Sequence, residues 1–85
     1  MYEIRFSKAA VKKIDDLTKN QKSKLKEIIG EMKLNPFSVP FTRIKGEINV
    51  YRIRIGDYRI LFEMDKEERI ISILKVEHRK KIYSR

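Results

Sequence analysis

The chain has 85 residues and a formal net charge of +9, from 21 Lys and Arg against 12 Asp and Glu. A chain of this length buries only about 60–65% of the surface that it exposes when unfolded, and we expect residues 1–85 to form a single domain. The absence of cysteine and the single histidine exclude disulfides, thiolate metal sites and a histidine-rich metal centre, so no cofactor is expected. The basic balance indicates a polyanionic partner, either nucleic acid or an acidic protein.

The sequence contains no candidate membrane segment. Its apolar runs are far shorter than the roughly 20 residues that a membrane-spanning helix needs. Residues 1–6 alternate polar and apolar side chains, where a signal peptide would have an apolar block. We therefore expect a cytoplasmic protein that is not inserted in a membrane.

The first half of the chain is expected to form one strand and two helices. Residues 2–6 alternate in the period-two pattern of a half-buried strand. Ser7 is a candidate N-cap for a first helix, and the pattern of a second helix ends before Pro36 because proline disfavours helical geometry in the residue before it. The apolar positions that face the core are Ala10, Val11, Ile14 and Leu17 in the first helix and Leu25, Ile28, Ile29 and Met32 in the second. The two helices are expected to pack as an antiparallel hairpin.

The second half of the chain is predicted to be a β-meander. After a loop at residues 36–40 and a brief strand at 42–45 closed by Gly46, three strands are predicted over residues 48–55, 58–64 and 70–76. Their short connections suit antiparallel hairpins. The predicted fold class is α+β, with an N-terminal strand and a two-helix antiparallel hairpin packed on a mainly antiparallel sheet of four to five strands.

Side-chain alternation divides the central strands into an apolar face and a basic face. The residues expected to meet the helices are Tyr51, Ile53, Ile55, Tyr58, Ile60, Phe62 and Met64. The opposite face is expected to receive Val50, Arg52, Arg54, Arg59, Leu61 and Glu63. Arginines fixed on strands can bind a phosphate bidentately and stabilise the extra negative charge of a pentacoordinate transition state.

Two segments give the chain a family resemblance. Residues 51–60 read YRIRIGDYRI and residues 76–83 read VEHRKKIY. Together with the order of strand, two helices and sheet, they resemble the RelE/ParE superfamily of toxins over essentially the whole chain. The RelE branch implies a toxin that enters the ribosomal A site, cleaves messenger RNA and forms a hetero-oligomer with a RelB-like antitoxin that holds it inactive. The ParE branch implies a poison of DNA gyrase without the basic catalytic set.

The basic residues retained here favour the RelE branch. Positions similar to those that RelE-type nucleases use are occupied by Lys45, Arg52, Arg54, Arg59, Arg79 and Tyr83. The implied chemistry is attack by a ribose 2′-hydroxyl on the adjacent phosphate, which leaves a 2′,3′-cyclic phosphate. Each acid–base role in such a reaction contributes about 10²–10⁴-fold in rate.

We assign expected roles to the members of this set. Arg59 stabilises the developing charge, and Arg79 shares that role. Arg52 and Arg54 position the nucleotide, because guanidinium groups stay protonated and are poor bases. Tyr83 stacks on a base or donates a phenolic proton. The further residues expected to bind RNA are Arg43, Lys45, Lys80 and Lys81.

Proton transfer has several candidates. His78 is the one side chain whose type is naturally suited to acid–base work at neutral pH, although a histidine beside basic residues is also typical of an ordinary surface. Glu63 and Glu77 are either acid–base participants or ion-pair partners of nearby arginines. Arginines on an exposed sheet face can also simply solvate it. The alternative functions are a gyrase poison and a non-catalytic, basic RNA-binding module.

Overall fold

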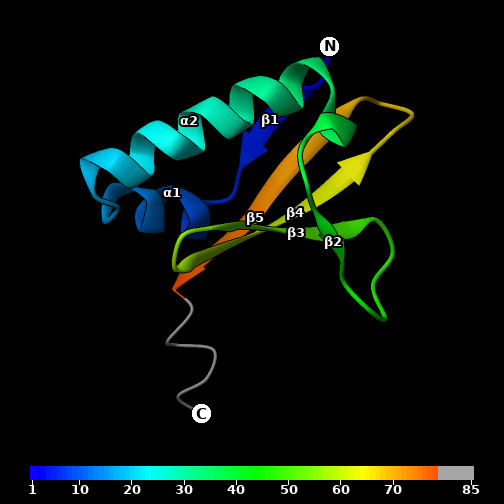
Figure 1. Cartoon of the computed structure of the whole chain (residues 1–85). Helices are drawn as coiled ribbons and strands as arrows, with labels where there is room; N and C mark the ends of the chain where they lie inside the picture. Colours follow the sequence, from blue (N-terminus) through cyan, green and yellow to red (C-terminus); the bar gives the residue numbers. More distant parts are fainter. Residues whose placement is uncertain (79–85) are drawn as a thin grey trace.

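The computed structural model of the protein describes residues 1–78. Its elements in chain order are β1 (Glu3–Phe6), α1 (Lys8–Asp15), α2 (Lys19–Leu34), a short 3₁₀ turn η1 (Pro36–Ser38), β2 (Thr42–Arg43), β3 (Val50–Ile55), β4 (Tyr58–Asp65) and β5 (Ile70–His78). The helices lie on one face of a five-stranded sheet, so the molecule has two layers (Figure 1). The predicted α+β fold is confirmed. Neither α1 nor α2 has the length and apolar composition of a transmembrane helix.

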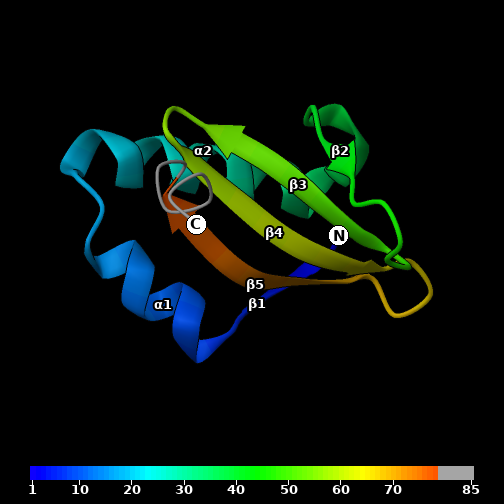
Figure 2. The ribbon, with the colours of Figure 1, turned by 90° about the horizontal axis from the view of Figure 1, so that it is seen from below.

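The sheet has the strand order β1-β5-β4-β3-β2. Strands β3, β4 and β5 form the predicted antiparallel meander, and β2 adds to the edge of β3. The N-terminal strand β1 pairs in parallel with β5, which places the first and last strands side by side (Figure 2). Figure 2 looks onto the sheet face that the helices leave uncovered, with α2 behind the strands.

Both helices begin at residues whose side chains cap the helix. The Ser7 hydroxyl accepts a hydrogen bond from the Ala10 backbone N–H at 3.0 Å, as predicted for an N-cap. Thr18 and Gln21 form a reciprocal capping box at the start of α2. The first helix is shorter than predicted, because the backbone N–H of Leu17 bonds back to the Ile14 carbonyl and Thr18 then starts the next helix. Leu17 is therefore buried from the turn between the helices.

The core lies between the helices and the apolar face of the sheet. The residues of β3 and β4 that were predicted to meet the helices are buried there, apart from half-buried Tyr58. Phe62 has no exposed surface and contacts the rings of Phe41 and Tyr51. The prediction was wrong for Val11, which is 47% exposed because α1 packs against β5 and leaves this side chain beside an open groove.

Candidate nucleic-acid interface

The uncovered face of the sheet carries a row of three charged residues on adjacent strands. Arg54 of β3 is the register partner of Arg59 of β4, and Arg59 is in turn the partner of Glu77 of β5. Register partners in antiparallel strands point to the same face, with Cβ atoms about 4.5–5.5 Å apart. Two guanidinium groups and one carboxylate therefore project side by side from β3, β4 and β5, one residue pair from the β3–β4 turn.

Arg59 is held more tightly than its neighbours. It lies in β4, the central strand, and is 9% exposed, which makes it the one charged residue among residues 1–78 that is buried. Arg54 beside it is exposed. A guanidinium stays protonated even when buried, and a fixed charge in a partly desolvated site interacts more strongly with a phosphate than one in bulk water. Arg59 is thus a preorganised anion-binding group, with Arg54 as a second, more exposed donor.

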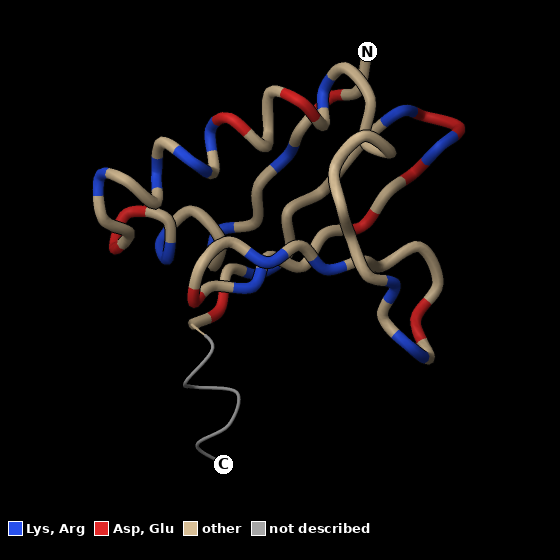
Figure 3. The backbone as a smooth tube through the Cα atoms, in the orientation of Figure 1, with Lys and Arg blue, Asp and Glu red and all other residues tan. Residues whose placement is uncertain are grey.

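A second row of the same face adds two further cations. Arg52 of β3 is the partner of Leu61, which is the partner of Lys75 in β5. The Lys75 Nζ lies 3.7 Å from a carboxylate oxygen of Glu77, which ties the second row to the first. We refer to Arg52, Arg54, Arg59, Lys75 and Glu77 as the basic face. In Figure 3, Lys and Arg positions gather where β3 and β4 run side by side, and others follow along α2.

A β-bulge determines which residues of β5 belong to the basic face. Leu61 pairs with Lys75, but the next residue, Phe62, pairs with Ile73, so Leu74 is an extra residue in β5. Before the bulge the odd-numbered residue Ile73 faces the core, and after it the even-numbered Val76 does. The bulge therefore turns Lys75 and Glu77 toward the arginines, which a strict period-two reading of the sequence would have placed on the core side.

Ser7 anchors this bulge from the first helix. Its hydroxyl donates to the Leu74 carbonyl oxygen at 2.7 Å while it caps α1, and its backbone N–H donates to the Ile73 carbonyl at 3.0 Å. One side chain thus links the start of α1 to the point where β5 changes register. Ser7 was not predicted as a site residue, and Glu77 was predicted only as either an acid–base participant or an ion-pair partner of an arginine. The one available signal for the bulge was the spacing of Ile71, Ile73 and Val76, which changes from two to three.

The structure does not bring all the predicted site residues together. His78 is the register partner of Tyr58, and their rings meet edge to face at 4.8 Å between centroids. Because Tyr58 shares its face with the buried Ile60, His78 points to the helix side of the sheet, away from the arginines. Arg43 is the partner of Tyr51 at the outer edge, and Lys45 is exposed in the loop that follows β2. Arg79, Lys80, Lys81 and Tyr83 lie outside the described residues.

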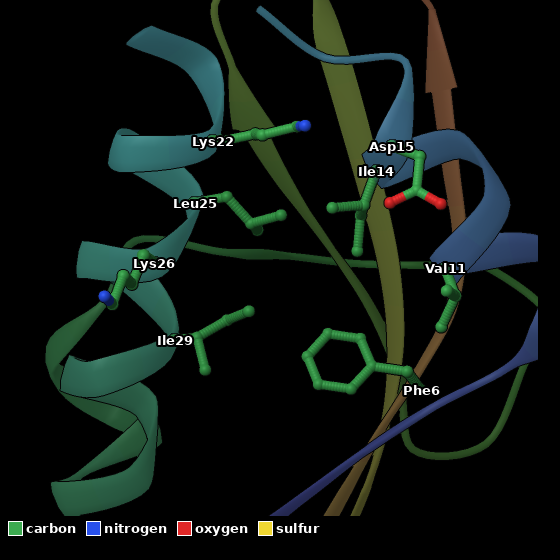
Figure 4. Close-up of a pocket in the computed structure, with 8 residues that line it drawn as sticks. All are labelled: Phe6, Val11, Ile14, Asp15, Lys22, Leu25, Lys26 and Ile29. Atoms are coloured by element: carbon green, nitrogen blue, oxygen red, sulfur yellow. The ribbon is translucent and has the colours of Figure 1, made fainter. Parts of the chain in front are cut away.

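A second surface feature lies between the helices. A groove of about 380 Å³ is lined by Phe6, Val11, Ile14, Asp15, Lys22, Leu25, Lys26 and Ile29. Figure 4 shows Phe6 from β1 and Val11 and Ile14 from α1 facing Leu25 and Ile29 from α2. Phe6 is 42% exposed there. The groove is mainly apolar, with two lysines and one aspartate among its lining residues, and it lies on the opposite side of the sheet from the basic face.

Comparison with known proteins decides the family. The sequence profile described as the ParE toxin of type II toxin-antitoxin systems, parDE, matches residues 4–83. The chain belongs to the RelE/ParE family of toxins. The putative toxin RelE1 of Methanocaldococcus jannaschii is 33% identical over 96% of this chain and 94% of its own length. Toxin RelE3 of the same organism is 35% identical over 95% of this chain and 94% of its own length.

Solved structures of RelE proteins share this fold. The RelE chain in the crystal structure of the RelB–RelE antitoxin–toxin complex from Methanococcus jannaschii is 33% identical, with a TM-score of 0.79 over 94% of this chain and 95% of that one. The corresponding chain of the archaeal RelE–RelB complex from Pyrococcus horikoshii OT3 is 26% identical, with a TM-score of 0.78 over 92% and 94% of the two chains. The curated relatives at 33–35% identity carry the RelE name, which agrees with the branch favoured by the basic residues.

Proposed function

We propose that this RelE-family toxin is a ribosome-dependent endoribonuclease that cleaves messenger RNA in the A site and so inhibits translation in the cytoplasm. The scissile phosphate binds at the Arg54–Arg59 pair. The ribose 2′-hydroxyl attacks it, the bond to the 5′-oxygen breaks, and the products carry a 2′,3′-cyclic phosphate and a 5′-hydroxyl. The observation that carries this proposal is the buried Arg59 flanked by Arg54 on one open sheet face.

The roles of the described residues follow from their positions. Arg59 is fixed and charged, so it donates hydrogen bonds to the equatorial oxygens as negative charge builds up on the phosphorus centre. Arg54 adds a second donor to the same phosphate, and Arg52 and Lys75 bind the adjoining backbone. Arg43 and Lys45 lie farther out, at β2 and the loop after it, and contribute general attraction to RNA. Arg79 and Tyr83 are proposed to complete the site.

Dependence on the ribosome has a physical basis in this arrangement. The basic face is open, and binding RNA there supplies affinity but not the in-line geometry that the 2′-hydroxyl needs. Holding reacting groups in an attack geometry lowers the barrier by as much as about 7–11 kcal/mol. The ribosomal A site is proposed to supply that geometry by presenting the codon in a fixed conformation.

The test uses programmed ribosomes with a defined messenger, and primer extension to map the ends. Wild-type protein is expected to cut within the A-site codon. Arg59→Lys keeps the charge but loses the bidentate fork and is expected to lower the rate, and Arg59→Ala is expected to lower it further, by about 10²–10³-fold for one lost donor. An intact messenger with folded wild-type protein would overturn the proposal.

Arg5→Ala is the matched control for these variants. Arg5 lies in β1 at the sheet edge, where its Nε donates to the Glu3 carboxylate at 2.6 Å, and this hydrogen bond raises the pKa of Arg5. The pair is exposed, and strand β5 lies between it and the strands that carry Arg59 and Arg54. Removing Arg5 deletes one arginine from the same sheet, so cleavage by this variant is expected to match that of the wild type.

A RelB-like antitoxin is the proposed protein partner, in a hetero-oligomer that silences the toxin. The complexes from Methanococcus jannaschii and Pyrococcus horikoshii provide the support for this assignment. The apolar groove between the helices is lined by Lys22 and Lys26 as well as Asp15, and it suits an amphipathic segment whose acidic side chains pair with the two lysines of α2. Co-purification with the product of an adjacent gene would test the partnership, and recovery of the toxin alone at nanomolar dilution would speak against a stable complex.

The second candidate function is a gyrase poison. The matching family profile is the one described for ParE, and this observation favours the candidate. A supercoiling assay with purified gyrase distinguishes this function from messenger RNA cleavage. Inhibition of gyrase, together with an intact messenger on programmed ribosomes, would establish the gyrase poison. A basic module without catalysis would instead bind RNA in a salt-sensitive manner, leave the messenger intact and leave gyrase activity unchanged.

A further inference from the structure

We propose that Glu77 is the general base of the cleavage reaction, the group that takes the proton from the attacking 2′-hydroxyl. This role rests on the ribonuclease activity proposed above. It supplies the proton acceptor, which the arginines cannot provide. Guanidinium and ammonium groups are protonated at neutral pH and only donate hydrogen bonds, whereas a carboxylate accepts a proton. The basic face therefore needs an acceptor close to its phosphate site.

Glu77 lies in the right row of the sheet. It is the register partner of Arg59 on the same face, so a phosphate bound by Arg59 lies beside the Glu77 carboxylate. The Glu77 side chain is 30% exposed, which leaves it accessible to a ribose. On this face of β4 the carboxylate nearest to Arg59 is Glu63, which is four residues away along the strand, or about 13 Å at the usual rise of a strand. Glu63 is too far away to serve the same phosphate.

The β5 bulge is the structural reason that Glu77 faces the arginines. Without the extra residue Leu74, the period-two alternation that places Ile71 and Ile73 in the core would also send residue 77 to the core side. Bulges that re-aim a side chain are common next to active sites. Here the bulge is held by the Ser7 hydroxyl at 2.7 Å from the Leu74 carbonyl. The same shift turns His78 to the helix side. Among residues 1–78, the Glu77 carboxylate is then the proton acceptor that lies beside the Arg54–Arg59 pair.

The 2′-oxygen forms a bond to phosphorus as its proton passes to a carboxylate oxygen of Glu77. The phosphorus–O5′ bond breaks, and the leaving 5′-oxygen takes a proton from solvent water. Afterwards Glu77 returns its proton to solvent. Arg59 and Arg54 keep their protons throughout and stabilise the phosphorane.

The charged groups around Glu77 are consistent with this role. Arg59 of β4 faces it directly, Arg54 of β3 lies beyond Arg59, and Lys75 on its own strand approaches to 3.7 Å. Strand β1 pairs only with residues 70–73 of β5 and ends before Glu77. The rival interpretation is that Glu77 serves only as a counter-ion for these cations, in which case its neutralisation would change stability and RNA affinity but not the rate of bond cleavage.

Single-turnover cleavage on programmed ribosomes, with toxin in excess, distinguishes the two. Glu77→Gln keeps the shape of the side chain and removes its ability to accept a proton. Its rate constant is expected to fall by about 10²–10⁴-fold, the usual contribution of a general base. Binding of this variant to ribosomes is expected to be no weaker than that of the wild type. Glu63→Gln removes a carboxylate from the same face and is expected to cleave at the wild-type rate.

Two outcomes would overturn the assignment, and they have different meanings. Glu77→Gln cleaving as fast as the wild type would leave the nuclease standing and remove Glu77 from the chemistry. A wild-type protein that does not cleave would overturn the nuclease and this role with it. If Glu77→Gln fails to fold by thermal melting, the pair Glu77→Asp and Glu77→Asn replaces it, since these side chains are equal in size and differ in the acceptor. The aspartate variant is expected to cleave faster, and equal rates would contradict the proposal.

Discussion

The substitution Ser7→Ala probes the link between the first helix and the bulge of β5. The Ser7 hydroxyl makes two hydrogen bonds, one from the Ala10 backbone N–H at 3.0 Å and one to the Leu74 carbonyl at 2.7 Å. Losing an N-cap costs typically about 1 kcal/mol, and losing a further hydrogen bond costs about 1 kcal/mol. The free energy of unfolding is therefore expected to fall by about 2 kcal/mol.

Thermal denaturation followed by circular dichroism measures this effect. In a domain of this size, about 1 kcal/mol shifts the Tm by roughly 4–8 °C, so Ser7→Ala is expected to lower the Tm by about 8–16 °C. Thr18→Ala is the matched control, because Thr18 caps α2 through Gln21 and no side-chain bond from its hydroxyl to the sheet is present in residues 1–78. Its Tm is expected to fall by only about 4–8 °C.

The cleavage assay adds a second measurement to the same pair of variants. Loosening the bulge is expected to slow cleavage by Ser7→Ala at a temperature where it remains folded, whereas Thr18→Ala is expected to cleave normally. Ser7→Thr retains the hydroxyl and is expected to retain most of both properties. Equal losses of Tm for Ser7→Ala and Thr18→Ala, with equal cleavage rates, would refute the idea that Ser7 supports the bulge.

Three further predictions concern the turns, the histidine and the basic face. Gly30→Ala, at an exposed position of α2, is expected to raise the free energy of unfolding by about 0.5–1 kcal/mol. Gly56→Ala, at a turn residue with a φ of 55°, is expected to lower it by about 1 kcal/mol. Urea denaturation measures both changes, and changes of the same sign would contradict the turn geometry. His78→Ala is expected to lose the ring contact with Tyr58, worth about 0.5–1.5 kcal/mol, but to keep the single-turnover cleavage rate, and a large fall in that rate would return His78 to the site. Arg54→Ala is expected to reduce the slope of log K for single-stranded RNA against log salt by about 0.7, the value for one lost phosphate contact, as measured by fluorescence anisotropy, and an unchanged slope would remove Arg54 from the RNA contact.

Local patterns in the sequence predicted most of the fold. The alternation in β3 and β4 correctly separated the core-facing side chains from Arg52, Arg54 and Arg59, because each strand has one face against the helices and one face on the uncovered side of the sheet. Ser7 and the proline after α2 marked helix ends through chemistry that acts within a few residues. Such signals depend on near neighbours in the chain and can be read without the tertiary structure.

Features set by distant contacts were not predicted. The parallel pairing of β1 with β5 joins residues 3–6 to residues 70–73, and no local pattern specifies that partner. The bulge at Leu74 reversed the faces of Glu77 and His78, so the histidine that was favoured by its chemical type turned away while a glutamate took its place beside Arg59. Val11 was expected in the core because its spacing fits a helix, but α1 packs against β5 and leaves that position beside the groove.

The central claim is that the 2′-hydroxyl of the A-site codon is the nucleophile at the basic face. It is tested most directly by programming ribosomes with two messengers that are identical except that the A-site codon of one contains 2′-deoxyriboses. The account predicts cleavage of the all-ribose messenger, with a 2′,3′-cyclic phosphate on the upstream product, and no cleavage of the deoxy messenger. Equal cleavage of both messengers would contradict attack by the 2′-hydroxyl and, with it, the roles assigned to Arg59 and Glu77.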